Sequence, residues 1–299
     1  MLTFNLLKKL AHGLVACTMM LLCIAPYPAK HMPKDKDNLQ LTFSVLSDVH
    51  IESNNLETYR MYFKIMRDAK KMEGGNDAIV FLGDNTMNGQ DIESMFFYGA
   101  LNAVNPADEI IVASGNHDFG NGNGDYEKYE KRYINYNNFF FHHGIDKPYY
   151  YKVINDCYFI VLATESDTVN LMDISETQLQ WLGSVLNEAQ KTGKPIFIFN
   201  HYPVDYIDDY NYTALADVID DYDNVVYFSG HTHNAYGYGS VSNIYGINHI
   251  NLPKCTEHAL EDYDGGIGAQ VEVYSDEVVV RIRDFADNVW LDEYIYEIN

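Results

Sequence analysis

The chain has 299 residues, of which 47% are hydrophobic and 14% aromatic, and a formal net charge of -23 at pH 7. This length and composition are typical of a folded globular protein that buries a sizeable core. The negative charge argues against a basic nucleic-acid groove and a polybasic membrane contact. A small phosphorylated substrate stays possible, because clustered divalent cations dominate the field around their own site. Four cysteines are too few for a disulfide scaffold.

The N-terminus has the pattern of an export signal. Two lysines precede an apolar stretch over residues 10–27, and a polar run follows it. At roughly 18 residues, this stretch is near the length at which a membrane span becomes possible. The residues ending in Cys17 also resemble a bacterial lipoprotein box. We expect residues 1–38 to be a signal peptide or membrane anchor plus linker, rather than a buried helix, and 39–299 to be a single domain outside the cytoplasm.

From residue 41 onward, buried apolar runs alternate with amphipathic helical patterns. This alternation is typical of a parallel sheet, in which functional sites form at the carboxyl ends of the strands. The patterns predict strands at 41–47, 78–82, 109–113, 195–199 and 225–229, and helices at 56–72, 91–104, 126–141, from Ser175 onward, and at 212–220.

Two other segments depart from that alternation. Apolar runs at 149–153 and 158–162 flank Asn155-Asp156, which predicts a hairpin. After Asn248, strands follow one another without helices at 249–252, 269–274, 278–282 and 290–298. An antiparallel sheet added to a parallel one implies two sheets packed face to face. We therefore predict an α/β fold, a four-layer α/β/β/α sandwich of two mixed β-sheets flanked by helices.

Polar side chains of the kind that bind metals follow five of these strands. Neutral imidazole is the commonest nitrogen ligand of transition metals, and carboxylates supply oxygen ligands. Their repeated position at strand ends predicts one shared site at the edge of a sheet. The blocks are Asp48-Val49-His50, Gly83-Asp84, Gly115-Asn116-His117-Asp118, Asn200-His201 and Gly230-His231-Thr232-His233.

In this order, the five blocks resemble the signature motifs of the calcineurin-like metallophosphoesterases, from about residue 41 to residue 233. Gln178-x-x-Trp181-Leu182 is also similar to a motif that many members carry before the His201 strand. The resemblance implies that His117 donates a proton to the leaving oxygen or contacts the phosphate. It also implies two metal ions, one held by Asp48, His50 and His233, the other by Asn116, His201 and His231, with Asp84 bridging them.

Two differences from the motifs of known subfamilies argue against two branches of this family. Met87 occupies the position where purple acid phosphatases carry a metal-bound tyrosine, and His50 supplies a ligand instead. The residues after Asp84 lack the Gly-Asp-x-x-Asp-Arg-Gly block of the Ser/Thr protein phosphatases. The Asp-x-His and Gly-His-x-His arrangement is more similar to the bacterial cyclic-nucleotide phosphodiesterase and general phosphoesterase branch.

The implied ligands suit hydrolysis of a phosphoric ester. Two metal ions about 3.5–4 Å apart acidify a shared water and stabilise charge on the phosphoryl oxygens. The mixed nitrogen and oxygen ligands fit Mn, Fe, Zn, Co or Ni better than Ca or Mg. We predict a phosphodiesterase or phosphomonoesterase with a small phosphorylated substrate and His117 as general acid. The alternatives are a catalytically inactive metal-binding protein on the same fold and hydrolysis of a non-phosphate bond by the same metals.

The remaining candidates are expected to be structural. Asp118 either orients its neighbours or caps a turn, and Tyr202 and Tyr236 lie beside ligand blocks. The acidic tract at 205–212 reads as a solvated loop. His142 and His143 are expected to have a loop or packing role rather than to line the substrate cleft, and His249 and His258 are expected to be non-ligands.

Overall fold

The computed structural model describes residues 33–35, 37–72, 75–169, 171–204, 209–234, 240–244, 246–256 and 265–298. The predicted export segment, with residues 10–27 and Cys17, lies outside these ranges. Within them, every helix is too short or too polar to cross a membrane.

The first sheet is mixed and has the strand order β12-β11-β10-β1-β2-β3. Its parallel half places β1 beside β2 and β2 beside β3, and β10 pairs with β1 in the antiparallel direction. The strands are β1 (Leu41–Leu46), β2 (Ala78–Phe81), β3 (Glu109–Val112), β10 (Ile267–Val273), β11 (Val278–Asp284) and β12 (Val289–Ile298).

The second sheet is also mixed and has the order β4-β5-β6-β7-β9-β8. The predicted hairpin is present, since β4 and β5 are antiparallel and both turn residues, Asn155 and Asp156, have positive φ. β5, β6, β7 and β9 are parallel neighbours. The strands are β4 (Tyr150–Ile154), β5 (Cys157–Val161), β6 (Ile196–Phe199), β7 (Val225–Ser229), β8 (Val241–Ile244) and β9 (Ile247–Asn251).

The C-terminal strands differ from the prediction in two ways. β9, expected in an antiparallel group, runs parallel to β7, and β8 was not predicted. β8 is a short edge strand that pairs only with β9 within the described ranges, and its sequence Val-Ser-Asn-Ile has little apolar pattern. The late strands are thus divided between the two sheets.

Alternate side chains of the strands face two different cores. In β1 and β2, Phe43 and Val80 belong to the central core between the sheets, whereas Leu46 and Phe81 belong to the core under the first layer of helices. Phe43 lies 4.8 Å, between ring centroids, from Phe159 of the opposite sheet. Burial on both faces explains why the strands read as continuous apolar runs.

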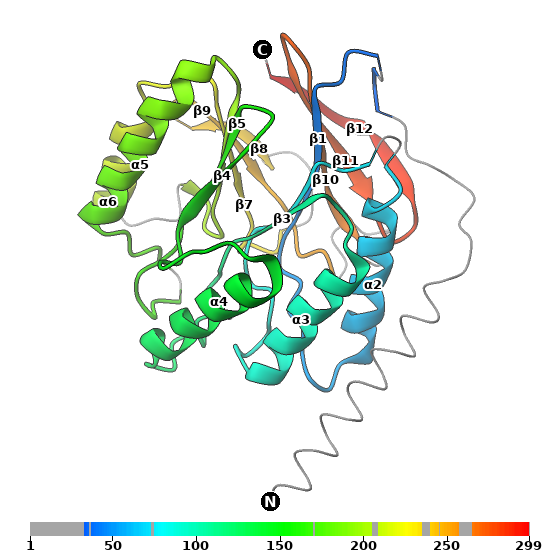
Figure 1. Ribbon diagram of the computed structural model, residues 1–299, viewed down its shortest axis with the longest axis vertical. Coiled ribbons are helices and arrows are strands. Elements are labelled where there is room, and N and C mark those ends of the chain that lie inside the picture. Colours follow the sequence, from blue (N-terminus) through cyan, green and yellow to red (C-terminus); the bar gives the residue numbers. More distant parts are fainter. Residues whose placement is uncertain are drawn as a thin grey trace, which may run out of the picture.

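Helices cover both outer faces, which confirms the predicted four-layer sandwich (Figure 1). α6 begins at Asp209, so the end of the tract predicted as an acidic loop is helical. The first sheet carries α2 (Leu56–Ala69), α3 (Asp91–Val104) and α4 (Tyr126–Phe141), and the second carries α5 (Glu176–Ala189) and α6 (Asp209–Ile219), with a short 3-10 turn at Gln190–Thr192.

Candidate metal centre

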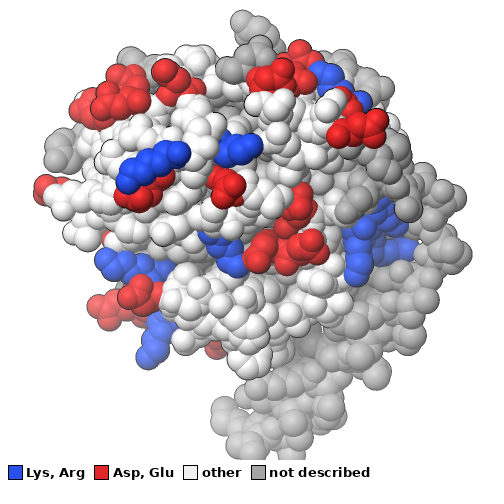
Figure 2. Space-filling model, turned by 45° about the horizontal axis from the view of Figure 1, so that its top comes forward, with Lys and Arg blue, Asp and Glu red and all other residues white. Residues whose placement is uncertain are grey.

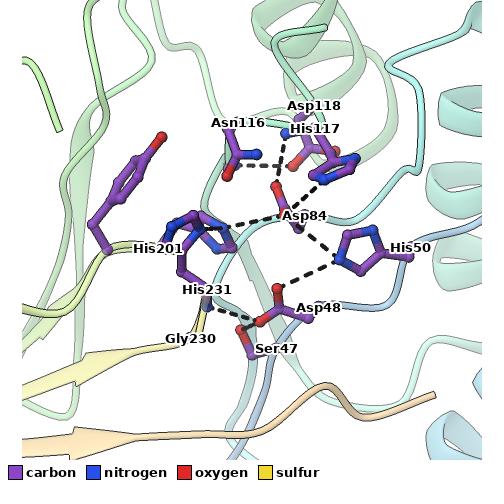
Figure 3. Close-up of polar contacts among 12 residues, drawn as sticks. Ser47, Asp48, His50, Asp84, Asn116, His117, Asp118, His201, Gly230 and His231 are labelled. Atoms are coloured by element: carbon purple, nitrogen blue, oxygen red, sulfur yellow. Dashed lines mark hydrogen bonds and ion pairs between the residues drawn. The ribbon is translucent and has the colours of Figure 1, made fainter. Parts of the chain in front are cut away.

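The predicted ligands lie just beyond the carboxyl ends of strands from both sheets. Their converging positions are drawn in Figure 3, where Asp84 lies between His50 on one side and His201 and His231 on the other. Asp48 and His50 follow β1, Asp84 follows β2, Asn116 follows β3, His201 follows β6, and His231 and His233 follow β7.

Six of these side chains form two groups whose candidate ligand atoms lie within 4.8 Å of one another. Asp84 is a member of both groups. The first group is Asp48, His50, Asp84 and His233, and the second is Asp84, His201 and His231.

Ring nitrogens and carboxylate oxygens converge in the first group. His50 Nε2 lies 3.1 Å from His233 Nε2, and His233 Nε2 lies 2.9 Å from Asp48 Oδ1. His50 Nε2 is also 3.5 Å from Asp84 Oδ2. Two ring nitrogens and two carboxylate oxygens so close together are the donor set that a divalent transition metal takes.

The second group has a carbonyl oxygen beside it. His201 Nε2 lies 3.2 Å from Asp84 Oδ2 and 3.2 Å from His231 Nδ1. The Asn116 amide donates from Nδ2 to Asn121 Oδ1 at 3.0 Å, which fixes the orientation of the amide. Its buried Oδ1 has no hydrogen-bond partner among the described residues. A cation would satisfy that oxygen, so the residues fit a second ion.

Each buried carboxylate uses one oxygen to hold the surrounding backbone. Asp48 Oδ2 accepts from Ser47 Oγ at 2.5 Å and from the His231 amide at 3.1 Å, which leaves Oδ1 facing His233. Asp84 Oδ1 accepts from the His117 amide at 2.8 Å, and its Oδ2 faces both groups. The protein therefore orients the free oxygen of each carboxylate toward the histidines.

The backbone at the site is strained. Five of the predicted ligands have left-handed backbone torsions, which cost non-glycine residues about 1–3 kcal/mol each. The φ values are 55° at Asp48, 48° at His50, 49° at Asp84, 69° at His231 and 53° at His233. Such strain persists where surrounding contacts hold it, and it clusters at functional sites.

The charges of the site suit cations. Burial raises the pKa of Asp84, but the charge and hydrogen bond of His201 outweigh burial and bring that pKa to about 2. Burial lowers the pKa of His201, and the charges of Asp84 and Asp48 raise it to about 9. Despite its burial, Asp48 also has a pKa well below its usual value, with His201 as the main cause. Both carboxylates are therefore anions at neutral pH.

His117 lies at the open side of the site. Its side chain is 17% exposed, whereas that of His201 is completely buried. His117 Nδ1 lies 2.6 Å from the carbonyl oxygen of Met87, so Nδ1–H donates to that carbonyl. Nε2 then faces the site, 4.0 Å from Asp84 Oδ2. This orientation leaves Nε2 as the atom that can exchange a proton with a substrate.

Asp118 anchors a turn instead of orienting His117. Its two oxygens accept from the Gly115 amide at 3.0 Å, from the Asn85 amide at 3.1 Å and from the Thr86 amide at 2.9 Å. The Asn85 and Thr86 side chains add two further bonds. Asp118 thus ties the loop after β2 to the loop after β3.

The other candidates among the described residues belong to neither group of ligands. His143 packs against Phe141 and Tyr150 and is hydrogen-bonded to the Ile110 carbonyl. His249 lies between two serines behind the turn that follows β7. Tyr202 is buried, with its ring centroid 4.8 Å from that of His231. Tyr236 and His258 are outside the described residues, and His142 ends α4 in a left-handed conformation.

Sequence reasoning missed three contributors to the site. Ser47 and the Met87 carbonyl orient Asp48 and His117, and Asn251 holds the turn after β7. Asn251 ends a strand, which is the signal that identified the ligands. It was not counted because β9 was expected in an antiparallel group.

The model of the calcineurin-like phosphoesterase family matches residues 41–235. No curated protein matches this chain. A dimetal phosphatase from Danio rerio has a similar solved structure, with a TM-score of 0.62 at 19% identity, covering 87% of this chain and 99% of that chain. A conserved uncharacterized protein from Streptococcus pneumoniae, described as a predicted phosphoesterase, gives 0.44 at 13% identity, covering 86% and 96%.

The similarity to the Danio rerio structure shows the shared fold. The family match spans all five strand-end blocks and well over half of the chain. In the structure, six acidic and imidazole side chains from four of these blocks form the two groups, with Asp84 in both: Asp48, His50, Asp84, His201, His231 and His233. The chain is therefore a member of the calcineurin-like phosphoesterase family.

Proposed function

We propose that the protein hydrolyses phosphoric esters with two divalent transition-metal ions. The membership of Asp84 in both groups carries this proposal, because one carboxylate can bind two cations at once. Asp48, His50 and His233 would hold one ion, Asn116, His201 and His231 the other, and Asp84 would be shared.

When bound, the two ions supply an acidified water and stabilise charge on the phosphoryl oxygens. Two carboxylates, Asp48 and Asp84, leave a pair of divalent ions with net positive charge for an anionic substrate. Asn116 adds a neutral ligand that preserves this excess. His117, held at Nδ1 by the Met87 carbonyl, donates a proton from Nε2 to the leaving oxygen.

The donor set guides the choice of metal. Four imidazoles, two carboxylates and one amide carbonyl favour Mn, Fe, Zn, Co or Ni over Ca or Mg, which take mainly oxygen ligands. The supply of each metal in the compartment where the protein works would decide which of these ions is bound. The apolar segment at 10–27 supports a location outside the cytoplasm, secreted or anchored to the membrane.

The charge distribution supports a small substrate. On the face shown in Figure 2, coloured Lys and Arg side chains lie in small groups beside Asp and Glu side chains. With a net charge of -23, such a surface repels large polyanions. We propose a phosphodiester or phosphomonoester of a small molecule as the substrate.

The direct test assays the purified, Mn²⁺-loaded protein on bis-p-nitrophenyl phosphate and p-nitrophenyl phosphate. We expect turnover that a chelator abolishes, and a loss of at least about 100-fold in Asp84→Asn, since even supporting residues of metal sites cost 10–100-fold. Asp156→Asn, the same charge change at the exposed hairpin turn, is the matched control. Two bound ions without turnover would favour the inactive metal-binding alternative. Turnover in Asp84→Asn equal to wild type would reject the proposal.

A further inference from the structure

One short turn serves both groups of ligands. Gly230 to His233 follow β7, and within this turn His231 belongs to the second group and His233 to the first. Their backbones are both left-handed, so the turn is strained at both ligands. A displacement of this turn would therefore affect both cation sites together.

Asn251 contacts this turn from the neighbouring strand. It ends β9 and lies opposite Ser229 in the parallel pairing of β7 and β9. Its Nδ2 donates to the Gly230 carbonyl at 2.7 Å and to Ser229 Oγ at 2.9 Å. Its Oδ1 accepts from Thr232 Oγ1 at 2.7 Å. The Asn251 amide thus bonds to Gly230, which precedes His231, and to Thr232, which precedes His233. Asn251 itself belongs to neither group of candidate ligands.

A buried polar chain supports Asn251 from behind. Ser229 Oγ lies 2.7 Å from His249 Nε2, and His249 Nδ1 lies 3.3 Å from Ser242 Oγ on β8. Ser229 and His249 are both buried. The two added strands β8 and β9 therefore extend the second sheet and also hold the metal-bearing turn.

On the opposite side, the turn packs against the end of β1. The His231 amide donates to Asp48, and a Cβ built on Gly230 would lie 1.8 Å from Ser47 Oγ. Asp48 is itself a candidate ligand, and it accepts from the turn through Oδ2 while Oδ1 faces His233. The Asn251 contacts are independent of the ligands and fix the turn from outside the site.

We propose that Asn251 is a positioning residue that sets the cation affinity of both sites through the Gly230–His233 turn. This inference rests on one part of the proposed function, that the two groups are cation sites, and not on the hydrolysis step. Residues that support metal ligands without touching the metal contribute about 10–100-fold to affinity. Because the turn carries one ligand of each group, Asn251 affects both affinities, unlike a residue that supports a single ligand.

The experiment titrates the purified protein with Mn²⁺ against a competing fluorescent chelator and counts bound ions by elemental analysis. We expect Asn251→Ala to weaken both binding steps by about 10–100-fold. Thr232→Val, which removes one of the three bonds at nearly constant volume, should weaken both by less. The double variant should lose less than the sum of the two, since the changes share one contact. Asn248→Ala, on the same strand, is the matched control, because its side chain bonds to Asn243 and not to the turn.

Thermal unfolding of each variant without metal, in the presence of a chelator, measures its stability. This measurement separates a loss of ligand positioning from a loss of folding stability. A variant that loses stability but keeps both affinities would overturn the proposal, as would loss of affinity at one site alone. Should Asn251→Ala fail to fold, Thr232→Val carries the test, and wild-type affinities in that variant would overturn it. Wild type that binds two ions without turnover would remove the proposed function and leave this inference standing. Wild type that binds no ion would remove both.

Discussion

At the residue scale, His117 is the one candidate catalytic group whose two ring nitrogens have separate tasks. Nδ1 is fixed by the Met87 carbonyl, and Nε2 faces Asp84 at the open side of the site. A proton donor is needed in proportion to the basicity of the leaving oxygen. The two roles considered for His117, proton donation and phosphate contact, therefore differ in how activity depends on the leaving group.

We expect His117→Asn to lower kcat by about 10²–10⁴-fold for an alkyl phosphoester, with both ions retained. For a p-nitrophenyl ester the loss should be much smaller, because p-nitrophenolate leaves without a proton. Steady-state kinetics on the two esters, with metal content measured in parallel, make the comparison. An equal loss on both esters would assign His117 to phosphate contact instead.

His143, which lies away from the candidate metal site, makes the free energy of unfolding depend on pH. Burial, with the nearby charge of Lys152, lowers its pKa from 6.5 to about 4. The unfolded chain therefore binds this proton at a higher pH than the folded chain does. The stabilisation is fully present above pH 6.5 and is lost as the pH falls toward 4, at a cost on the order of 3 kcal/mol.

His143→Phe should remove that pH-dependent contribution, since a phenyl ring suits the space between Phe141 and Tyr150. Denaturant unfolding at pH 7 and pH 4.5 tests this. The loss of stability between the two pH values should be smaller in the variant than in wild type. Equal losses in the two proteins would show that His143 is not buried as a neutral ring.

At the element scale, the turns after the strands hold the candidate ligands. Gly230 is required where the turn after β7 passes β1, because a Cβ would overlap Ser47 and Asp48. A helical glycine provides the contrast: a Cβ on Gly183 of α5 meets Val218 at 3.8 Å, an ordinary contact.

Gly230→Ala should destabilise the protein by about 1–3 kcal/mol, as overpacking does. It should also weaken metal binding, because the clash displaces the turn from Asp48. Gly183→Ala should be neutral or stabilise by up to about 1 kcal/mol through helix propensity. Chemical denaturation and metal titration of both variants give the comparison. A Gly230→Ala protein as stable as Gly183→Ala would contradict the close packing of the turn.

The strand pattern was enough to predict the sandwich and the five blocks at the strand ends, whereas the choice of ligands within the blocks came from the family resemblance. Apolar runs and the polar blocks after them are local signals, and parallel strands bring their ends to one edge. β8 and the direction of β9 were missed because pairing with β7 is a long-range choice that a four-residue polar edge strand does not encode. Asn251 was missed for the same reason. The bond from Met87 to His117 uses a backbone carbonyl, which no residue type marks.

At the scale of the whole molecule, the site joins the two sheets. A candidate ligand follows each of β1, β2 and β3 of one sheet and each of β6 and β7 of the other. Bound cations would therefore link the sheets at this edge, in addition to the core between them. Binding to the folded chain alone stabilises it by mass action, about 2.7 kcal/mol for each site at 100 times its Kd.

We expect Mn²⁺ to raise the Tm of wild type by several degrees over the chelator-treated protein. The increase should be much smaller in Asp84→Asn, which lacks the shared carboxylate, and should be retained in Asp156→Asn. Differential scanning calorimetry at matched free metal concentrations measures all three. A wild-type Tm that does not respond to metal would argue against ligands drawn from both sheets.

The most direct measurement is anomalous diffraction at the Mn edge from crystals grown with Mn²⁺. Two anomalous peaks are expected about 3.5–4 Å apart, on either side of Asp84. His50 and His233 should be bound to one ion, and His201 and His231 to the other. A single peak, or peaks away from Asp84, would contradict a binuclear centre built on that carboxylate.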